Sequence, residues 1–372
     1  MSRSLVCTAV LSTLALAACL PPVSETDKAA TDSGAGDGAA DTADETDGSG
    51  TGGTGGEETG GGTGDEGAGG GTGDEGAGGG TGGEGSSGDG SGDGSGESGG
   101  DAGGGTGSGG PGPDYGSAGG SPVGTTTGSA SLGGGCSMDY TTYTPASGAL
   151  GVRVILAHGF TRSPSTLGDW AQLLASHGLE VVTPALCHSS FLDTDHVQNG
   201  ADMVALNAAL GGGDVIYMGQ SAGGLSAFLA AADDAQALGV VGLDATDDFF
   251  GAGASAASRV GVPAFGIVGE AGTCNSNGNF VSAYQSAPDS RILRVLESEH
   301  CDFESPTDWG CTALCTVANP TFSDAELRYA IGGLMTSAAI SLAGDPAAET
   351  DWWVSGGAYF DEMTAAGMLQ AL

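Results

Sequence analysis

The distribution of glycine and of large apolar residues divides the chain into two segments that differ in their ability to fold. Residues 1–135 hold 47 of the 75 Gly, whereas residues 136–372 contain all four Trp and a normal supply of Val, Leu, Ile and Phe. A segment without large apolar side chains cannot bury enough surface to offset the conformational entropy lost on folding. We therefore expect one folded domain, over residues 136–372, of a size that suits a single α/β unit.

The first 18 residues are typical of a secretory signal. Arg3 precedes an apolar stretch over 5–18, which is too short to span a bilayer as a permanent helix. The stretch ends in Leu-Ala-Ala followed by Cys19, and this ending resembles the lipobox of bacterial lipoproteins. The resemblance implies a lipid on Cys19, and Leu20 in place of Asp resembles the pattern that sorts lipoproteins to the outer membrane. We expect a protein of the bacterial cell envelope, anchored to the membrane through Cys19.

Residues 19–135 are predicted to form a disordered linker. From residue 20 to residue 135 the chain carries 20 acidic residues and one basic residue, Lys28, and it shows no hydrophobic periodicity. A nonapeptide occurs twice in tandem, over 63–71 and 72–80, but Gly or Ala occupies the position at which a calcium-binding repeat needs a large apolar side chain. Repulsion between the carboxylates extends such a chain, so we expect the linker to hold the domain away from the membrane.

After Cys136, short apolar runs alternate with longer amphipathic segments, a pattern typical of a parallel sheet with crossover helices. We predict strands over 152–157, 179–183, 214–218, 240–243, 264–268 and 292–296, and helices over 165–176, 199–210, 222–232, 280–285 and 323–342. The last helix has Ser323 as its N-cap and Glu326 at the capping-box position. The expected fold class is α/β, with a mostly parallel central sheet and helices on both faces.

The sequence Gly219-Gln220-Ser221-Ala222-Gly223 lies between a predicted strand and a predicted helix. This is the context of the G-x-S-x-G elbow, in which a strained turn points the serine hydroxyl out of the sheet. Glycines two positions away on either side avoid collisions with neighbouring elements. The Ala222 N–H then lies at the positive end of the helix, where it can stabilise an oxyanion. Ser221 is the candidate nucleophile.

A second oxyanion donor is expected from the loop after an earlier strand, where His158-Gly159-Phe160 follows the strand at 152–157. This sequence resembles the HG-x oxyanion loop of the α/β-hydrolase family, and the resemblance covers most of residues 150–345. It implies that the Phe160 N–H is the donor and that His158 supports the loop without transferring protons.

The family order of nucleophile, acid and base requires the catalytic histidine to follow Ser221, and of the five His only His300 does. His300 lies in a short loop after the last predicted strand, which matches the family position of the base.

Three carboxylates qualify as the acid. Asp244 ends the strand at 240–243, and the sequence GLDA there resembles a segment of pancreatic-type lipases and plant chlorophyllases. Glu270 follows the next strand, which is the commoner family position, and Asp247 lies one turn beyond Asp244. Each of them could orient the histidine tautomer. We favour Asp244 and leave the other two open.

Six cysteines remain beyond the signal and Cys19, and an even number in an exported chain favours three disulfides. They are Cys136, Cys187, Cys274, Cys301, Cys311 and Cys315. The sequence does not determine how they pair, but we expect a bridge to stiffen the loop of His300. A zinc site built from the last three cysteines and His300 is disfavoured by their spacing.

A second polar cluster, His188, Asp193, Asp195 and His196, follows the strand at 179–183. It could line the substrate cleft or bind a metal, but we interpret it as a polar loop, and we expect no metal or cofactor. Only 17 residues separate Asp244 from Val262, too few for a helical cap. An open cleft, with Phe249 and Phe250 nearby, suits bulky or polymer-borne esters, as in cutinase-like and chlorophyllase-like enzymes.

These features predict a surface-anchored, monomeric serine hydrolase of carboxylic esters. A peptidase or acyltransferase with the same triad is an alternative, as is a non-catalytic binding protein that retains the fold. The net charge of −38 excludes nucleic acid as a partner, because two polyanions repel each other. The predicted domain itself carries 26 acidic residues against six Arg, which favours neutral or cationic substrates.

Overall fold

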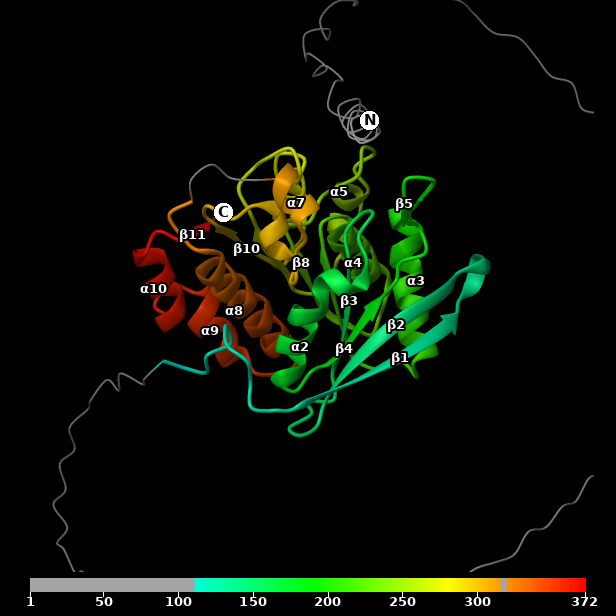
Figure 1. Cartoon of the computed structure of the whole chain (residues 1–372), viewed down its shortest axis with the longest axis horizontal. Coiled ribbons are helices and arrows are strands. Elements are labelled where there is room, and N and C mark those ends of the chain that lie inside the picture. The colour runs from blue at the N-terminus through cyan, green and yellow to red at the C-terminus, as the bar shows by residue number, and fades with distance from the viewer. Residues whose placement is uncertain (1–110, 316–319) are drawn as a thin grey trace, which may run out of the picture. The chain divides into compact units, whose positions relative to one another are not determined.

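The computed structural model describes residues 111–315 and 320–372. The signal at 1–18, Cys19 and the linker as far as residue 110 lie outside the described residues. Within the described part, nine strands form one sheet in the order β1-β2-β4-β3-β7-β8-β9-β10-β11 (Figure 1). The strands are β1 Val123–Ser131, β2 Ser137–Pro145, β3 Arg153–Ala157, β4 Glu180–Pro184, β7 Val215–Gln220, β8 Ala237–Leu243, β9 Ala264–Val268, β10 Ser290–Val295 and β11 Leu369–Ala371.

The central strands of the sheet are parallel to one another, and the outer strands on each side pair antiparallel with their neighbours. β4, β3, β7, β8, β9 and β10 pair in parallel. β2 pairs antiparallel with β4, β1 extends that edge, and β11 pairs antiparallel with β10 at the other edge. Because the central strands run in the same direction, the loops that follow them gather at the carboxyl ends of the strands. Ligands bind at these ends in open α/β folds.

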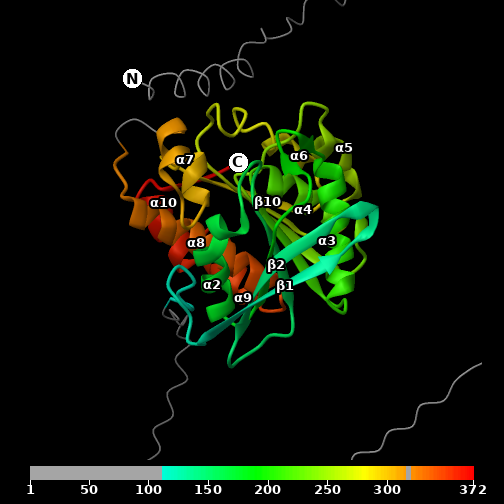
Figure 2. The same cartoon turned by 45° about the vertical axis from the view of Figure 1, so that its right-hand side comes forward.

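Helices cover both faces of the sheet (Figures 1 and 2). The first layer consists of α2 Gly168–Ser176, α8 Asp324–Leu342, α9 Pro346–Trp353 and α10 Ala358–Ala365, and the second of α3 His196–Ala209, α4 Ala222–Asp233, α5 Ala252–Ala256 and α6 Val281–Ser286. Along β3, Val154 and Leu156 join the apolar core of the first layer, whereas Ile155 and Ala157 join that of the second. This alternation explains why the strand reads as a continuous apolar run.

The predicted fold class is confirmed, and each predicted strand and helix corresponds to one in the structure. The capping box of α8 is also present, since the Ser323 hydroxyl accepts from the Glu326 N–H and the Glu326 carboxylate accepts from the Ser323 N–H. The segments that we did not predict include β1 and β2 at one side of the sheet and α9, α10 and β11 after α8. They also include the hairpin of β5 Ser189–Ser190 and β6 Asp193–Thr194, and α7 Trp309–Leu314.

The predicted end of the linker at residue 135 is wrong, because ordered structure begins earlier. β1 lies within the predicted linker and pairs with β2 along nine residues. Its side chains are mostly exposed Thr, Ser and Gly, so the strand contributes backbone hydrogen bonds and little apolar surface, and it leaves no hydrophobic pattern in the sequence. Tyr115 is buried beside Trp352, whose Nε1–H donates to the carbonyl of Pro113 (3.3 Å). A single aromatic residue in a Gly-rich segment was the available signal.

None of the helices in residues 111–315 and 320–372 combines the length and the hydrophobicity needed to cross a bilayer. The longest, α8, is buried instead and packs closely through two adjacent glycines. A Cβ atom added to Gly333 would lie 1.8 Å from Cζ3 of Trp352. That ring is fully buried and stacks on Tyr359 with a centroid distance of 4.2 Å, so it has no space to move.

We predict that Gly333→Ala lowers the free energy of unfolding by about 1–3 kcal/mol, because overpacking outweighs the gain in helix propensity. Urea denaturation followed by circular dichroism measures the change. Gly168→Ala is the matched control, since its added Cβ would meet only the Tyr143 hydroxyl, at 3.5 Å. Equal stability of the Gly333 variant and the parent would contradict this account of the packing.

Candidate active site

Ser221 occupies a tight turn between β7 and α4. Its backbone has φ 56° and ψ −128°, a strained conformation for a residue with a side chain. Four backbone hydrogen bonds fix the turn, one of them from Leu225 N–H to the Ser221 carbonyl (3.4 Å). The Ser221 N–H donates to the Leu243 carbonyl (3.0 Å), and the Ser221 carbonyl accepts from Gly224 N–H (2.9 Å) and Thr246 N–H (3.2 Å). Ser221 therefore lies where the elbow motif predicts, at the end of a central strand.

The glycines of the motif allow the backbone segments to approach each other. A Cβ on Gly219 would lie 2.3 Å from the Gly223 carbonyl oxygen, and one on Gly223 would lie 2.4 Å from the His158 carbonyl oxygen. A Cβ on Gly159 would lie 3.0 Å from that of Ser221 and 2.4 Å from the side-chain oxygen of Gln220. The Ser221 turn and the His158-Gly159-Phe160 loop thus require Gly at these three positions.

His158 holds the loop that carries Phe160. Its Nε2 accepts from Leu186 N–H (3.2 Å), so Nδ1 carries the hydrogen and donates to the Gly159 carbonyl (2.9 Å). Burial lowers the pKa of His158, which keeps the ring neutral. Within residues 111–315 and 320–372, no group accepts from the N–H of Phe160 or of Ala222. Both amides are therefore available to an incoming ligand.

Asp244 and His300 form the closest polar contact of the site. His300 Nδ1 lies 2.6 Å from Asp244 Oδ2, and the side chain of Asp244 is only 1% exposed. An ionised carboxylate can only accept, so the hydrogen is on Nδ1 and Nε2 keeps its lone pair. The carboxylate of Asp244 also accepts from Gly269 N–H (2.9 Å) and from the side-chain amide of Asn275 (3.1 Å). Three donors thus converge on this carboxylate.

The other two carboxylates have different partners. Asp247 accepts from the N–H groups of Gly253 (2.8 Å) and Ala254 (3.0 Å), at the start of α5. Glu270 accepts from Glu297 N–H (3.3 Å). Of the three candidates, Asp244 is therefore the one that the structure joins to His300.

The Ser221 hydroxyl and His300 are not hydrogen-bonded to each other in the described structure. The hydroxyl has Thr246 Oγ1 as its partner at 3.5 Å, and His300 Nε2 lies 3.2 Å from Nε2 of Gln220. The Gln220 amide therefore donates to the lone pair that a general base would use. Catalytic hydrogen bonds are often long before a substrate binds, so this arrangement remains compatible with a Ser–His pair.

Three supporting residues escaped the sequence analysis. Gln220 is the variable position of the elbow motif, and its side chain is almost fully buried against His300. Asn275 lies in a turn that has no periodic pattern, and its amide connects Asp244 to the Glu270 carbonyl (2.7 Å). Arg162 forms two hydrogen bonds with the buried Glu304 (2.6 and 2.5 Å). None of these residue types is distinctive without the neighbours that folding supplies.

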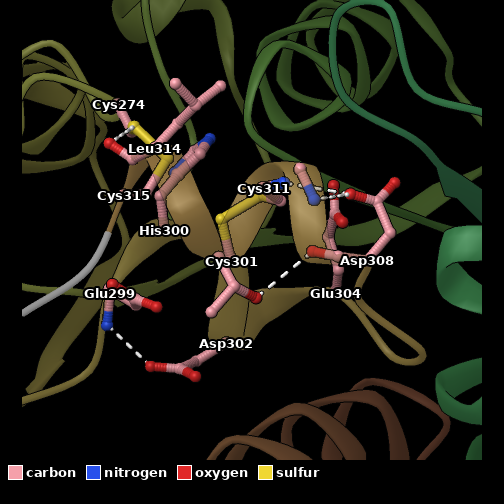
Figure 3. Close-up of a disulfide and its surroundings, with 12 residues drawn as sticks. Cys274, Glu299, His300, Cys301, Asp302, Glu304, Asp308, Cys311, Leu314 and Cys315 are labelled. Atoms are coloured by element: carbon pink, nitrogen blue, oxygen red, sulfur yellow. Dashed lines mark hydrogen bonds between the residues drawn. A yellow bond between two sulfur atoms is a disulfide. The ribbon is translucent and has the colours of Figure 1, made fainter.

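All six cysteines are paired, which confirms the prediction of three disulfides. The bridges are Cys136–Cys187, Cys274–Cys315 and Cys301–Cys311. Two of them flank His300 (Figure 3). Cys301, Cys311 and Cys315 lie close enough together to hold a metal ion, but their sulfur atoms take part in disulfides and are not thiolates.

The second polar cluster forms a pair of contacts around His188. Its Nδ1 bonds to Asp193 (2.9 Å), and its Nε2 lies 3.7 Å from the buried carboxylate of Asp202. The hydrogen bond to Asp193 raises the pKa of His188, which favours the charged ring beside these two acids. Asp195 instead caps α3 by accepting from Gln198 N–H (2.9 Å). His188 and these acids stabilise the loop between β4 and α3.

A cavity of 190 Å³ opens beside His300. The residues that line it include Glu270, Glu299 and Leu314, together with both cysteines of the disulfide Cys274–Cys315. The space next to the histidine is therefore lined by both polar and apolar residues.

No protein-family model and no curated protein matches the chain. Among solved structures, the chain is similar to dienelactone hydrolase from Anabaena variabilis, with 23% sequence identity and a TM-score of 0.42, over 48% of this chain and 88% of that chain. The fold of the described residues follows from their own strand order, elbow and loop positions, and it is the α/β-hydrolase fold.

Proposed function

We propose that the protein is a serine hydrolase that cleaves carboxylic esters, with Ser221 as nucleophile, His300 as base and Asp244 as acid. The observation that carries the proposal is the hydrogen bond of 2.6 Å between Asp244 and His300, next to a strained serine turn. Strained turns and buried acid–histidine pairs occur at functional sites more often than elsewhere. Their coincidence at the carboxyl ends of central strands supports catalysis rather than a structural role.

In the proposed cycle, Ser221 Oγ attacks the ester carbonyl while His300 Nε2 accepts its proton. His300 Nε2 must first exchange its contact with Gln220 for one with the Ser221 hydroxyl. The oxyanion forms against the N–H groups of Phe160 and Ala222, which have no partner in the described structure. The imidazolium donates its proton to the leaving alkoxide, and a water molecule, deprotonated by His300, then hydrolyses the acyl-enzyme. Asp244 holds the ring in the required tautomer and stays ionised.

The loop between β8 and β9 supports an open cleft. It contains only the short α5 and a further short helical turn at Ala257–Arg259, and both pack against the core of the domain. We infer that the substrates are bulky or polymer-borne esters. Peptidase or acyltransferase chemistry on the same residues remains the alternative, since these differ in the leaving group or the acceptor and not in the nucleophile.

We further propose that the enzyme is anchored in the bacterial cell envelope through a lipid on Cys19, with residues 20–110 as the tether. The lipobox-like sequence and the acidic, Gly-rich composition support this arrangement.

Replacing the nucleophile should abolish turnover. We predict that Ser221→Ala lowers kcat/KM for p-nitrophenyl butyrate at least about 10³-fold, because only the oxyanion donors and binding remain. Spectrophotometric assay of the parent and the variant measures the loss. Retention of more than a tenth of the activity would exclude Ser221 as the nucleophile.

The three carboxylates can be separated by isosteric substitution. Asp244→Asn should lower kcat/KM about 10²–10⁴-fold, since an amide favours the wrong histidine tautomer. Asp247→Asn and Glu270→Gln are the matched controls and should each change kcat/KM by less than about tenfold. A larger loss in either control than in Asp244→Asn, with similar melting temperatures, would reassign the acid.

The anchor can be tested by fractionation. In a bacterial host that processes lipoproteins, the parent should sediment with membranes, whereas Cys19→Ser should appear in the soluble fraction because it cannot be lipidated. Immunoblots of both fractions measure the distribution. Equal membrane association of the two proteins would remove Cys19 as the anchor.

A further inference from the structure

Seven large apolar side chains are exposed around the candidate active site, and we call them the apolar rim. They are Phe191, Leu192, Val197, Phe249, Phe250, Trp309 and Leu314, and each is more than half exposed. Among the described residues, only three other large apolar side chains are exposed, and they lie elsewhere: Leu150, Val354 and Leu372. A concentration of exposed apolar groups in one region of a soluble domain marks an interaction surface.

All parts of the rim lie on segments that follow central strands. Phe191, Leu192 and Val197 lie on the hairpin and helix after β4, the two Phe lie after β8, and Trp309 and Leu314 lie on α7 after β10. Since these strands are parallel, the segments gather at the edge of the sheet where β7 ends in Ser221. Figures 1 and 2 both place α5 and α7 toward the same end of the folded domain.

The part of the rim formed by Phe191 and Leu192 contacts the loop that carries Phe160. The ring of Phe191 packs edge-to-face on Phe160, with 5.0 Å between centroids, and Thr161 N–H donates to the Ser189 carbonyl (2.7 Å). A surface bound to Phe191 therefore lies directly beside the proposed oxyanion donor.

The other two parts of the rim, on the segment after β8 and on α7, are also connected to residues of the site. Phe249 and Phe250 follow Thr246, whose hydroxyl is the partner of Ser221. Arg162, two residues beyond Phe160, bonds to Asp308 (2.9 Å), next to Trp309. Leu314 lines the cavity beside His300. Each part of the rim is thus linked to the Ser221 turn, to the loop of Phe160 or to the cavity beside His300.

Two disulfides hold α7, which carries Trp309 and Leu314, in place. Cys301–Cys311 ties α7 to the residue after His300, and Cys274–Cys315 ties its end to the wall of the cavity (Figure 3). Trp309 and Leu314 are therefore exposed on a cross-linked segment. Such preorganisation reduces the ordering entropy that adsorption costs.

Charge and cavity shape restrict what the rim can bind. The segments of the rim also carry Asp193, Asp195, Asp247, Asp248 and Asp308, and residues 136–372 as a whole hold 26 acidic and six basic residues. An anionic lipid surface would be repelled by these carboxylates. A fatty acyl chain does not suit the cavity beside His300, because Glu270 and Glu299 form part of its wall. An uncharged solid with short, repeated ester units would not be repelled by the carboxylates. It also would not require a long acyl chain to enter the cavity.

We propose that the apolar rim adsorbs the enzyme to the surface of an uncharged, water-insoluble polyester, so that single ester groups reach Ser221. The proposal deepens the proposed function and rests on it, but adsorption itself requires no catalysis. The rim supplies the contact with the solid.

The test measures adsorption and turnover separately. All proteins are the full chain with Cys19→Ser, which removes any lipid that would itself adsorb. Binding to poly(ε-caprolactone) particles is measured as the loss of protein from solution. In this assay every protein also carries Ser221→Ala, so that hydrolysis cannot alter the surface. The rim variant is Phe249→Ser, Phe250→Ser and Trp309→Ser combined. Leu150→Ser with Val354→Ser is the matched control, because these side chains are exposed but lie outside the rim.

We expect the rim variant to bind the particles about tenfold or more weakly than the parent, and the control to bind like the parent. Turnover of soluble p-nitrophenyl acetate by Ser221-containing proteins should stay within about twofold in both, which also shows that they fold.

Four outcomes would overturn the proposal. Two concern the variants: equal adsorption of the rim variant and the parent, or equal weakening of adsorption in the control. The other two are tighter adsorption of the parent to a triolein emulsion or to phosphatidylglycerol vesicles than to polyester, and a dimer, detected by light scattering, that the rim substitutions dissociate. If the parent adsorbs through the rim but does not hydrolyse soluble esters, the proposed function fails and the adsorption surface stands.

Discussion

The tight turn at Ser221 is the constraint on which the arrangement of the site depends. A residue with a side chain adopts φ 56° there because four backbone hydrogen bonds and the close approach of two loops hold it. Gly159 and Gly223 permit that approach, and the loop of His158 and Phe160 can pack against the turn only because of them. The two free amides that could stabilise an oxyanion are a consequence of this packing.

The charged groups of the site depend on a second layer of contacts. Asp244 is buried, yet donors from Gly269, Asn275 and His300 satisfy its carboxylate. A buried carboxylate without such partners would take up a proton or destabilise the fold. The disulfide at Cys301 fixes the segment after His300 and at the same time positions α7, so the same bridge supports the histidine and the apolar rim.

The sequence predicted those parts of the structure that leave a periodic or motif-based signal. The strands around β7 and the capping box of Ser323 are examples, as are the elbow and the place of His300. The contact that sets Asp244 apart from Asp247 and Glu270 required the structure, because all three follow strands and only spatial proximity to His300 distinguishes them. β1 was missed because an exposed edge strand needs backbone pairing and not apolar residues. Gln220 and Asn275 gain their roles from neighbours that are distant in sequence.

The central claim is that Ser221 is a nucleophile activated by His300, and covalent labelling tests it most directly. The protein is treated with a fluorophosphonate, and the adduct is located by mass spectrometry of peptides. The account predicts one adduct, on Ser221, that is absent in Ser221→Ala and forms much more slowly in His300→Ala. No adduct on the folded protein, an adduct on another residue, or labelling at an unchanged rate without His300 would contradict it.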